Sequence, residues 1–114
     1  MLEIRTYRLA PEAGEEFDRV FREGALPLLE RFGVHIVGYG TSVHDEDQYV
    51  LMRAYPSVSR RDEQLEGFYG SAEWQENYEE IVQSLIESYQ TVVIPLTSSV
   101  LEALAAAMPA GRVQ

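Results

Sequence analysis

The sequence contains no cysteine and no lysine, so that its nine basic residues are all arginine. Without cysteine, the chain has no disulfide framework, no thiolate zinc site, no iron–sulfur cluster and no cysteine nucleophile. Long apolar runs are also missing. The longest uncharged apolar stretch, residues 91–100, contains Pro95 and is too short for a transmembrane helix. The N-terminus alternates apolar and charged residues instead of forming the apolar segment of a signal peptide, so we expect a cytoplasmic protein.

Acidic residues outnumber basic residues by 19 to 9, which gives a formal net charge of −10. A chain this acidic is repelled by the phosphates of nucleic acids and by anionic membrane surfaces. We therefore expect neither a nucleic-acid partner nor a membrane partner. With 114 residues, of which 46% are hydrophobic, the chain is long enough and apolar enough for one domain with its own core.

Changes in the hydrophobic period divide the chain into strands and helices. Segments rich in β-branched and aromatic residues predict four strands, at residues 2–9, 34–44, 48–55 and 91–96. The middle two form a hairpin around an acidic turn at residues 45–47. Apolar residues three or four apart predict two main helices, one between Gly14 and Gly33 and one over residues 71–89. Pro27 lies inside the first helix and predicts a kink or a helix in two pieces.

The resulting order β-α-β-β-α-β is typical of an α+β, ferredoxin-like fold. It predicts a four-stranded antiparallel sheet with both helices on one face. After Pro95, Ser99 and Glu102 form a capping box that predicts an extra helix over residues 98–108, and residues 109–114 are expected to fray. We expect a domain over residues 1–97 and a helical tail over residues 98–114.

The sheet face turned away from the helices is expected to be mixed in character. Strand alternation assigns to it Glu3, Arg5, Tyr7, Val37, Tyr39, Thr41, Val43, Tyr49, Leu51, Arg53 and Tyr55. This set is too apolar and aromatic for a face in water and too charged for a dry core. Tyrosine and arginine are enriched in interfaces, so we expect a symmetric homodimer that packs the two sheet faces together.

Several segments of the sequence resemble the NIPSNAP family. They are LEIRTYRL at the start, the helix end LPLLERFG, the strand VHIVGY and the segment FYGSAEWQ. The resemblance covers roughly residues 2–96 and leaves the tail outside. It implies a dimeric α+β barrel, in which the sheets of two copies close into one barrel. Relatives in that superfamily include cofactor-independent monooxygenases, haem-degrading enzymes and small polyketide cyclases.

A polar strip on the expected dimer face is the first candidate site. It consists of Glu3, Arg5, Tyr7, Tyr39 and Arg53. An arginine beside tyrosines in a water-poor space can bind a carboxylate or an enolate, and it can lower the pKa of a tyrosine that then acts as a base. Tyr7, Tyr39 and Arg53 are the catalytic candidates. The alternative is that Glu3 pairs with an arginine and that the tyrosines pack the dimer.

The second candidate site lies on the helix-covered face. Gly38 and Gly40 are expected to leave space there. Aromatic residues of the facing helices, Phe21, Trp74 and Tyr78, would close it into an apolar ligand pocket. The alternative is that the glycines curve the sheet and that helix side chains fill the space. The residues expected to bind a ligand are thus Arg5, Tyr7, Gly38, Tyr39, Gly40, Arg53, Trp74 and Tyr78.

Neither a metal nor a cofactor is expected. The two histidines, His35 and His44, lie about 30 Å apart along one strand and cannot share an ion within one subunit. The glutamates of residues 73–87 form a solvated helix face. Phosphate-binding glycine loops, GxSxG and HExxH are absent from the sequence.

The sequence leaves two functions open. The first is a homodimeric protein that binds a small apolar or aromatic molecule. If it is an enzyme, its reaction would be a cofactor-independent oxygenation, cyclisation or isomerisation, with a tyrosine as acid or base and an arginine stabilising an anion. The second is a non-enzymatic module that serves only interaction and assembly.

Overall fold

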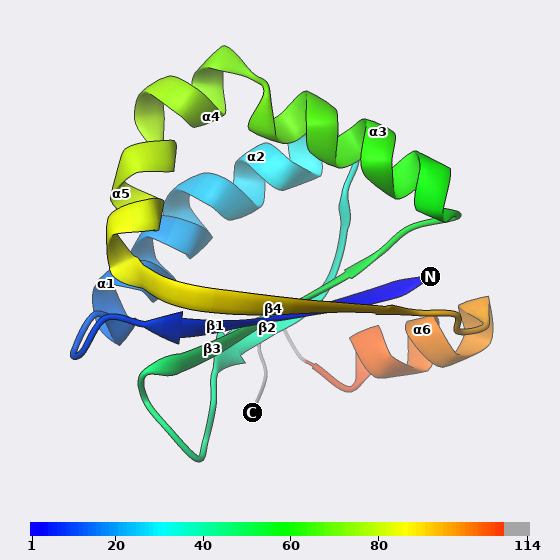
Figure 1. Ribbon diagram of the computed structural model, residues 1–114. Coiled ribbons are helices and arrows are strands. Elements are labelled where there is room, and N and C mark those ends of the chain that lie inside the picture. The colour runs from blue at the N-terminus through cyan, green and yellow to red at the C-terminus, as the bar shows by residue number, and fades with distance from the viewer. Residues whose placement is uncertain (109–114) are drawn as a thin grey trace.

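A computed structural model describes residues 1–108 of the chain and shows a single antiparallel sheet with helices on both faces (Figure 1). The strands are β1 (Leu2–Leu9), β2 (His35–Thr41), β3 (Gln48–Ala54) and β4 (Ile86–Ile94), in the order β2-β3-β1-β4. The chain therefore has the expected α+β, ferredoxin-like architecture. The fraying expected of residues 109–114 lies outside the described residues.

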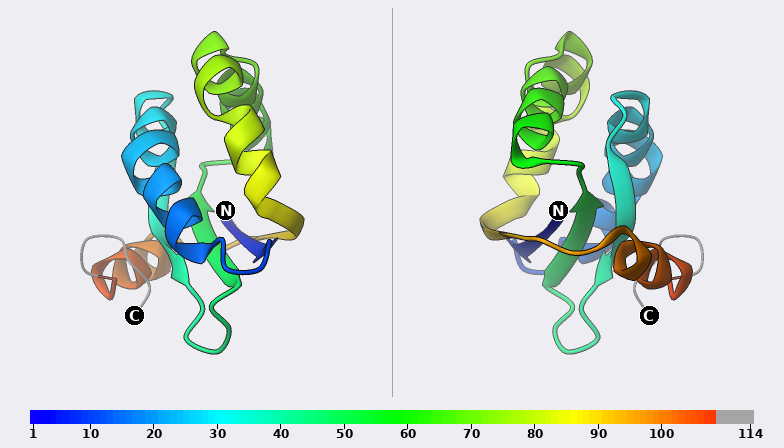
Figure 2. Two further views of the ribbon diagram at one scale, coloured as in Figure 1. Left: turned by 90° about the vertical axis from the view of Figure 1, so that its left-hand side faces the viewer. Right: turned by 90° about the vertical axis from the view of Figure 1, so that its right-hand side faces the viewer.

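Two rows of helices cover one face of the sheet and lie side by side (Figure 2). The first row consists of α1 (Gly14–Val20), the π-helical turn η1 (Phe21–Ala25) and α2 (Leu26–Arg31). The second row consists of α3 (Val58–Tyr69), α4 (Ala72–Asn77) and α5 (Glu79–Leu85). The last helix, α6 (Ser98–Ala106), lies on the opposite face. The sheet is thus covered on both sides.

Pro27 explains the form of the first row. It lies in the first turn of α2, where the missing backbone N–H does no harm. The turn before it is widened, because the N–H of Leu26 donates to the carbonyl of Phe21, five residues earlier. The helix continues in pieces, as predicted. Gly33 ends it with a φ of 81°, a conformation that other residues rarely adopt.

The prediction of a single helix over residues 71–89 was wrong. The helix breaks at Tyr78, whose φ of −131° and ψ of −31° lie outside the helical region, and it ends at Leu85. From Ile86 onward the chain pairs with β1 along the whole strand. Pairing with a neighbouring strand outweighs the helical period of this segment, so Tyr89 lies opposite Tyr7 in the sheet.

The hairpin of β2 and β3 has a longer turn than expected. Tyr39 pairs with Leu51, and a bulge lies between Ile36 and Gly38. The bulge turns Val37 toward the opposite face, where it joins the second apolar cluster. The cap of α6 also differs. Thr97, rather than Ser99, accepts the N–H of Val100, at 3.4 Å.

The largest correction concerns which sheet face the helices cover. The strip that was expected to face a dimer partner lies beneath the helix rows, since Tyr7, Tyr39, Tyr49 and Leu51 belong to the main core together with Phe17 and other helix residues. Alternation along a strand shows which residues share a face, but not which face the helices take. The charged residues were assigned outward because a core normally excludes charge, whereas here they pair with one another.

The opposite face carries a smaller apolar cluster, formed by Leu2, Val37, Met52 and Ala54. Residues of α6 and its ends cover this cluster, namely Leu101, Leu104, Ala105 and Met108. The predicted tail helix therefore docks on the sheet that precedes it.

Candidate functional site

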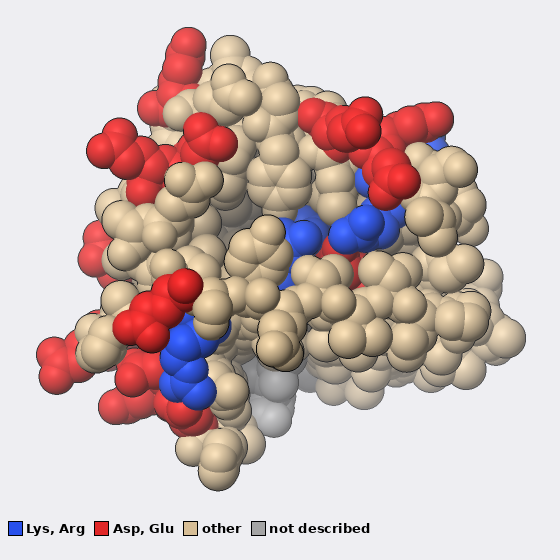
Figure 3. All heavy atoms as spheres, viewed as in Figure 1, with Lys and Arg blue, Asp and Glu red and all other residues tan. Residues whose placement is uncertain are grey.

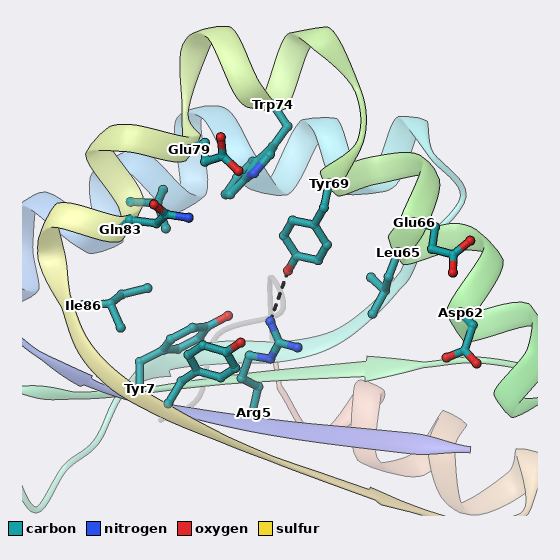
Figure 4. A pocket seen from close by; sticks show the side chains of 12 residues that line it. Arg5, Tyr7, Asp62, Leu65, Glu66, Tyr69, Trp74, Glu79, Gln83 and Ile86 are labelled. Carbon is teal, nitrogen blue, oxygen red and sulfur yellow. Dashed lines mark hydrogen bonds between the residues drawn. The ribbon is translucent and has the colours of Figure 1, made fainter.

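A pocket of about 550 Å³ opens between the second helix row and the sheet (Figure 4). The sheet supplies its floor and the helices its roof and mouth. It is lined by Arg5, Tyr7, Asp62, Leu65, Glu66, Tyr69, Trp74, Glu79, Val82, Gln83, Ile86 and Tyr89. Its volume and its mixture of aromatic walls with a few polar groups are typical of small-molecule sites.

The corner between α3 and α4 fixes the roof of the pocket. The hydroxyl of Ser71 donates to the carbonyl of Phe68 at 2.7 Å and accepts the N–H of Trp74 at 3.2 Å. The indole of Trp74 packs edge-on against Tyr69, with the ring centroids 5.4 Å apart. Both aromatic rings are thereby held over the pocket by the turn that joins the two helices.

A cluster of charged residues forms the inner end of this region. Glu3 and Arg53 are both fully buried, and Arg53 Nε donates to Glu3 Oε1 at 2.5 Å. Arg61, from α3, donates through Nε to Glu3 Oε2 at 2.9 Å. Arg5 Nη2 lies 3.9 Å from the same oxygen. Three guanidinium groups therefore surround one carboxylate. Arg61 Nη1 also lies 3.4 Å from Asp62 Oδ1, so that the three arginines and these two carboxylates leave one positive charge in excess.

This cluster of arginines contrasts with the acidic surface around it. In Figure 3, basic side chains lie in the hollow between the helix layer and the sheet, whereas acidic side chains surround it on the outer helices. Because the whole protein carries a net charge of −10, the basic groups in this hollow are a local feature.

Tyr69 links two of the arginines. Its hydroxyl accepts hydrogen bonds from Arg5 Nη1 at 3.2 Å and from Arg53 Nη1 at 3.4 Å, and it points down toward the floor (Figure 4). A phenol hydroxyl has two lone pairs and one proton. With both lone pairs engaged, its proton is available for a ligand.

Arg5 is held in place from its other side. Its Nε donates to Thr91 Oγ1 at 3.1 Å, and its guanidinium carbon lies 4.8 Å from the ring centroid of Tyr89. A cation over an aromatic face is stabilised by the ring's electrons. Strand β4 therefore orients the guanidinium that β1 supplies.

Two buried polar atoms have no hydrogen-bond partner among the described residues. They are Arg53 Nη2 and the hydroxyl of Tyr55. A void of about 30 Å³ adjoins Arg53, and Tyr7, Tyr69 and Trp74 line both this void and the larger pocket. Arg53 is the one charged residue of the void's lining, which is otherwise mostly apolar and aromatic.

Burial and charge set the protonation states at the site. Burial raises the pKa of Tyr7 to about 12, despite the nearby arginines. Tyr7 is therefore a neutral phenol at physiological pH, and the lowered pKa that we expected for a tyrosine here is not found for it. Burial on its own raises the pKa of Glu3, but the charge of Arg53 and the hydrogen bonds from Arg53 and Arg61 outweigh this and lower it. Glu3 is therefore an anion.

Metal-binding clusters and membrane-spanning helices are absent from residues 1–108. Histidine, aspartate and glutamate side chains form no group of three or more there that could hold a metal ion. None of the helices in this part of the chain is long and apolar enough to cross a membrane.

A model of the NIPSNAP family matches residues 2–100 of the chain. The chain belongs to the NIPSNAP family. A comparison with curated protein sequences finds no match.

Solved structures with the same fold include other NIPSNAP proteins. One from Agrobacterium tumefaciens shares 24% identity, with 88% of this chain and 91% of that chain covered and a TM-score of 0.79. A NIPSNAP domain protein from Burkholderia xenovorans shares 22% identity over 85% of this chain and 95% of that chain, with a TM-score of 0.75. A protein from Nitrosomonas europaea, provisionally described as an antibiotic biosynthesis monooxygenase, shares 16% identity over 83% and 96%, with a TM-score of 0.64. At these identities, the likeness extends to the fold alone.

Within this NIPSNAP fold, the structure brings together four of the residues expected to bind a ligand. Arg5, Tyr7 and Trp74 line the pocket, and Arg53 lines the void beside it. The expected pairing of Glu3 with an arginine is also present, as the Glu3–Arg53 ion pair.

The other four predicted residues lie elsewhere. Tyr39 packs on Phe21 beneath the first helix row, with the centroids 5.1 Å apart. Because Tyr39 faces the helices, its neighbours Gly38 and Gly40 face the α6 side. The prediction of a pocket between these glycines and the second helix is therefore wrong, because the glycines lie on the other face of the sheet. Tyr78 packs between the helix rows, against Gly24.

Tyr69 and Arg61 are the site residues that the sequence analysis missed. Tyr69 belongs to the NIPSNAP segment FYGSAEWQ, but a single tyrosine near a helix end carries no distinguishing pattern. Arg60 and Arg61 are the only two adjacent basic residues in the sequence. This pair, in an otherwise acidic helix, was the available signal for a carboxylate partner.

Proposed function

We propose that this NIPSNAP protein binds a small, largely apolar molecule in the pocket between the second helix row and the sheet. The observation that carries the proposal is the convergence of Arg5, Arg53 and Tyr69 at the inner end of a pocket with aromatic and aliphatic walls. A module that serves only assembly has no need for such a hollow.

The same arrangement supports cofactor-independent chemistry. Oxygenation, cyclisation and isomerisation of an activated aromatic or polyketide-like substrate each pass through an enolate or a related carbanion. Arg5 and Arg53 would stabilise this anion when the substrate enters already ionised, and the neutral phenol of Tyr7 would donate a hydrogen bond to it. The fold shared with the Nitrosomonas europaea protein supports this class of reaction only by analogy.

Native mass spectrometry of the purified protein, followed by denaturation, tests for a bound molecule directly. A library of aromatic and polyketide-like compounds, scored by thermal shift, extends the test to weaker ligands. Gln83 is exposed and lines the pocket, so Gln83→Phe is expected to fill the pocket and abolish the shifts. Asn77→Phe, on an exposed position outside the pocket, is the matched control. Wild-type protein that carries and binds no compound would support the assembly module instead.

We also propose a homodimer, in which the β4 edges of two copies pair and join the two sheets. Support comes from β4, an edge strand of nine residues whose positions 87–92 are all exposed. Such an edge presents unpaired backbone groups, and two antiparallel copies of it complement each other about a two-fold axis. Light scattering should give twice the monomer mass. Val92→Glu, which sets like charges near the axis, should give a monomer, and a monomeric wild type would refute the dimer.

A further inference from the structure

The three arginines at the inner end of the pocket carry one more charge than Glu3 and Asp62, the carboxylates that pair with them. Both oxygens of Glu3 are engaged, Oε1 by Arg53 and Oε2 by Arg61. Arg5 reaches the same carboxylate only at 3.9 Å. A buried cation is costly unless it is paired and hydrogen-bonded. The cluster therefore favours one more negative group.

The unsatisfied donors point to the shape of that group. Arg53 Nη2 is buried and has no partner among the described residues, and the proton of Tyr69 is available once its hydroxyl has accepted from both arginines. The adjoining void of about 30 Å³ has room for two oxygen atoms and little more. A planar carboxylate matches this space and can accept from both donors. A phosphate is bulkier and carries a third oxygen.

The mouth of the pocket adds a second restriction. Asp62, Glu66 and Glu79 all belong to the lining, and they come from the helices α3 and α5 (Figure 4). Three carboxylates at the entrance repel a ligand with several negative charges more strongly than a monoanion. Between the two charged regions, the walls include Leu65, Val82 and Ile86.

From these observations, we infer that the ligand is a monocarboxylate with an aromatic or aliphatic body. Its carboxylate enters the void and accepts hydrogen bonds from Arg53 Nη2 and the Tyr69 hydroxyl beside Arg5, while its body fills the larger pocket. This inference rests on the proposed small-molecule function and adds the charge and the orientation of the ligand.

The test compares matched probes that differ only in their head group. Hydrocinnamate, cyclohexylacetate and octanoate are titrated beside the amide of each acid and the phosphate ester of each matching alcohol. Trp74 is the single tryptophan of the protein and lines both spaces, so that its fluorescence reports binding directly. Calorimetry measures the same affinities independently. We expect at least one carboxylate to bind about 10-fold or more tightly than its amide and its phosphate ester.

The outcomes separate the inference from the proposed function. Amides or phosphate esters that bind as tightly as the carboxylates would overturn the inference and leave the pocket proposal standing. If none of the probes binds, whatever its head group, both the pocket proposal and the inference are refuted for ligands of this size.

Two substitutions locate the carboxylate while keeping both members of the Glu3–Arg53 pair. Arg5→Met and Tyr69→Phe keep the bulk of each side chain, and both should weaken carboxylate binding several-fold while leaving amide binding unchanged. Arg19→Met is the matched control, because it removes the same charge from an exposed position of α1. Equal weakening of carboxylate and amide by the two pocket variants would show a packing role only and would contradict the placement.

Discussion

Beneath the first helix row, from α1 to α2, the sheet is covered by close ring contacts, whereas beneath the second row, from α3 to α5, it borders a pocket. Phe17 and Phe21 contact Tyr39 and Tyr49 with centroid distances of 4.9 to 5.9 Å. On the other side, β1 and β3 present Arg5 and Arg53, whose head groups require polar partners. Apolar side chains cannot fill the space around them without leaving those groups unsatisfied. The pocket therefore lies beneath the second helix row, where the sheet presents its arginines.

Removing one member of the buried Glu3–Arg53 ion pair should lower the free energy of unfolding more than any other substitution in these two regions. In Arg53→Met, Glu3 loses its fully buried partner and keeps only Arg61 and the more distant Arg5, so we expect a loss of about 3–5 kcal/mol in the free energy of unfolding. The double variant Glu3→Leu/Arg53→Met removes both charges and should recover a large part of this loss. Urea denaturation measures both. A double variant as unstable as the single variant would show that the arginine contributes mainly by its packing.

A matched pair of leucines tests the difference between the filled and the hollow side. Leu28, on α2, is 2% exposed and lies in the closely packed half, whereas Leu65, on α3, is 8% exposed and borders the pocket. Leucine-to-alanine changes in cores cost about 2–5 kcal/mol and scale with the cavity that remains. We expect Leu28→Ala near the upper end of this range and Leu65→Ala near the lower end. Equal losses in urea denaturation would contradict a preformed hollow.

The boundary between the two halves depends on a glycine. A Cβ on Gly24 would lie 2.2 Å from Tyr78 Cε1, so that Gly24→Ala must displace the ring of Tyr78. We expect a loss of about 1–3 kcal/mol from this overpacking, measured by urea denaturation. The second change Tyr78→Leu should restore part of the loss, since it removes the ring that is struck. If the double variant is no more stable than Gly24→Ala alone, the loss of stability arises in the helix backbone instead.

Much of the fold could be predicted from the sequence, because strand alternation and helical spacing are local patterns. The order of elements, the break at Pro27 and the helix after Pro95 all rest on such patterns. The continuation of β4 back to Ile86 could not be predicted in this way, since it depends on pairing with β1, more than 70 residues away in the sequence. The local spacing of Ile81, Leu85 and Tyr89 suits a helix equally well.

The candidate site could be predicted only in its composition. Arg5, Tyr7 and Arg53 were identified as one strip, because alternate residues of paired strands share a face. Which side the helices cover depends on the handedness of the connections and on packing, and neither is visible in a strand pattern. Tyr69 and Arg61 reach the strip from a helix whose own spacing does not show what it contacts.

The smallest expected effect concerns the second unpartnered group. The Tyr55 hydroxyl is buried, and it has no hydrogen-bond partner among the described residues. Burial raises the pKa of Tyr55, so that the phenol stays neutral. Removing a polar atom that makes no hydrogen bond loses only its packing contacts and relieves a desolvation penalty. Tyr55→Phe should therefore change the free energy of unfolding by less than about 1 kcal/mol, and we expect a gain in stability.

Tyr49→Phe is the matched comparison, because the Tyr49 hydroxyl donates a hydrogen bond to Asp18 at 2.8 Å and its variant should lose stability. A loss in Tyr55→Phe as large as that in Tyr49→Phe would mean that the Tyr55 hydroxyl is hydrogen-bonded in solution.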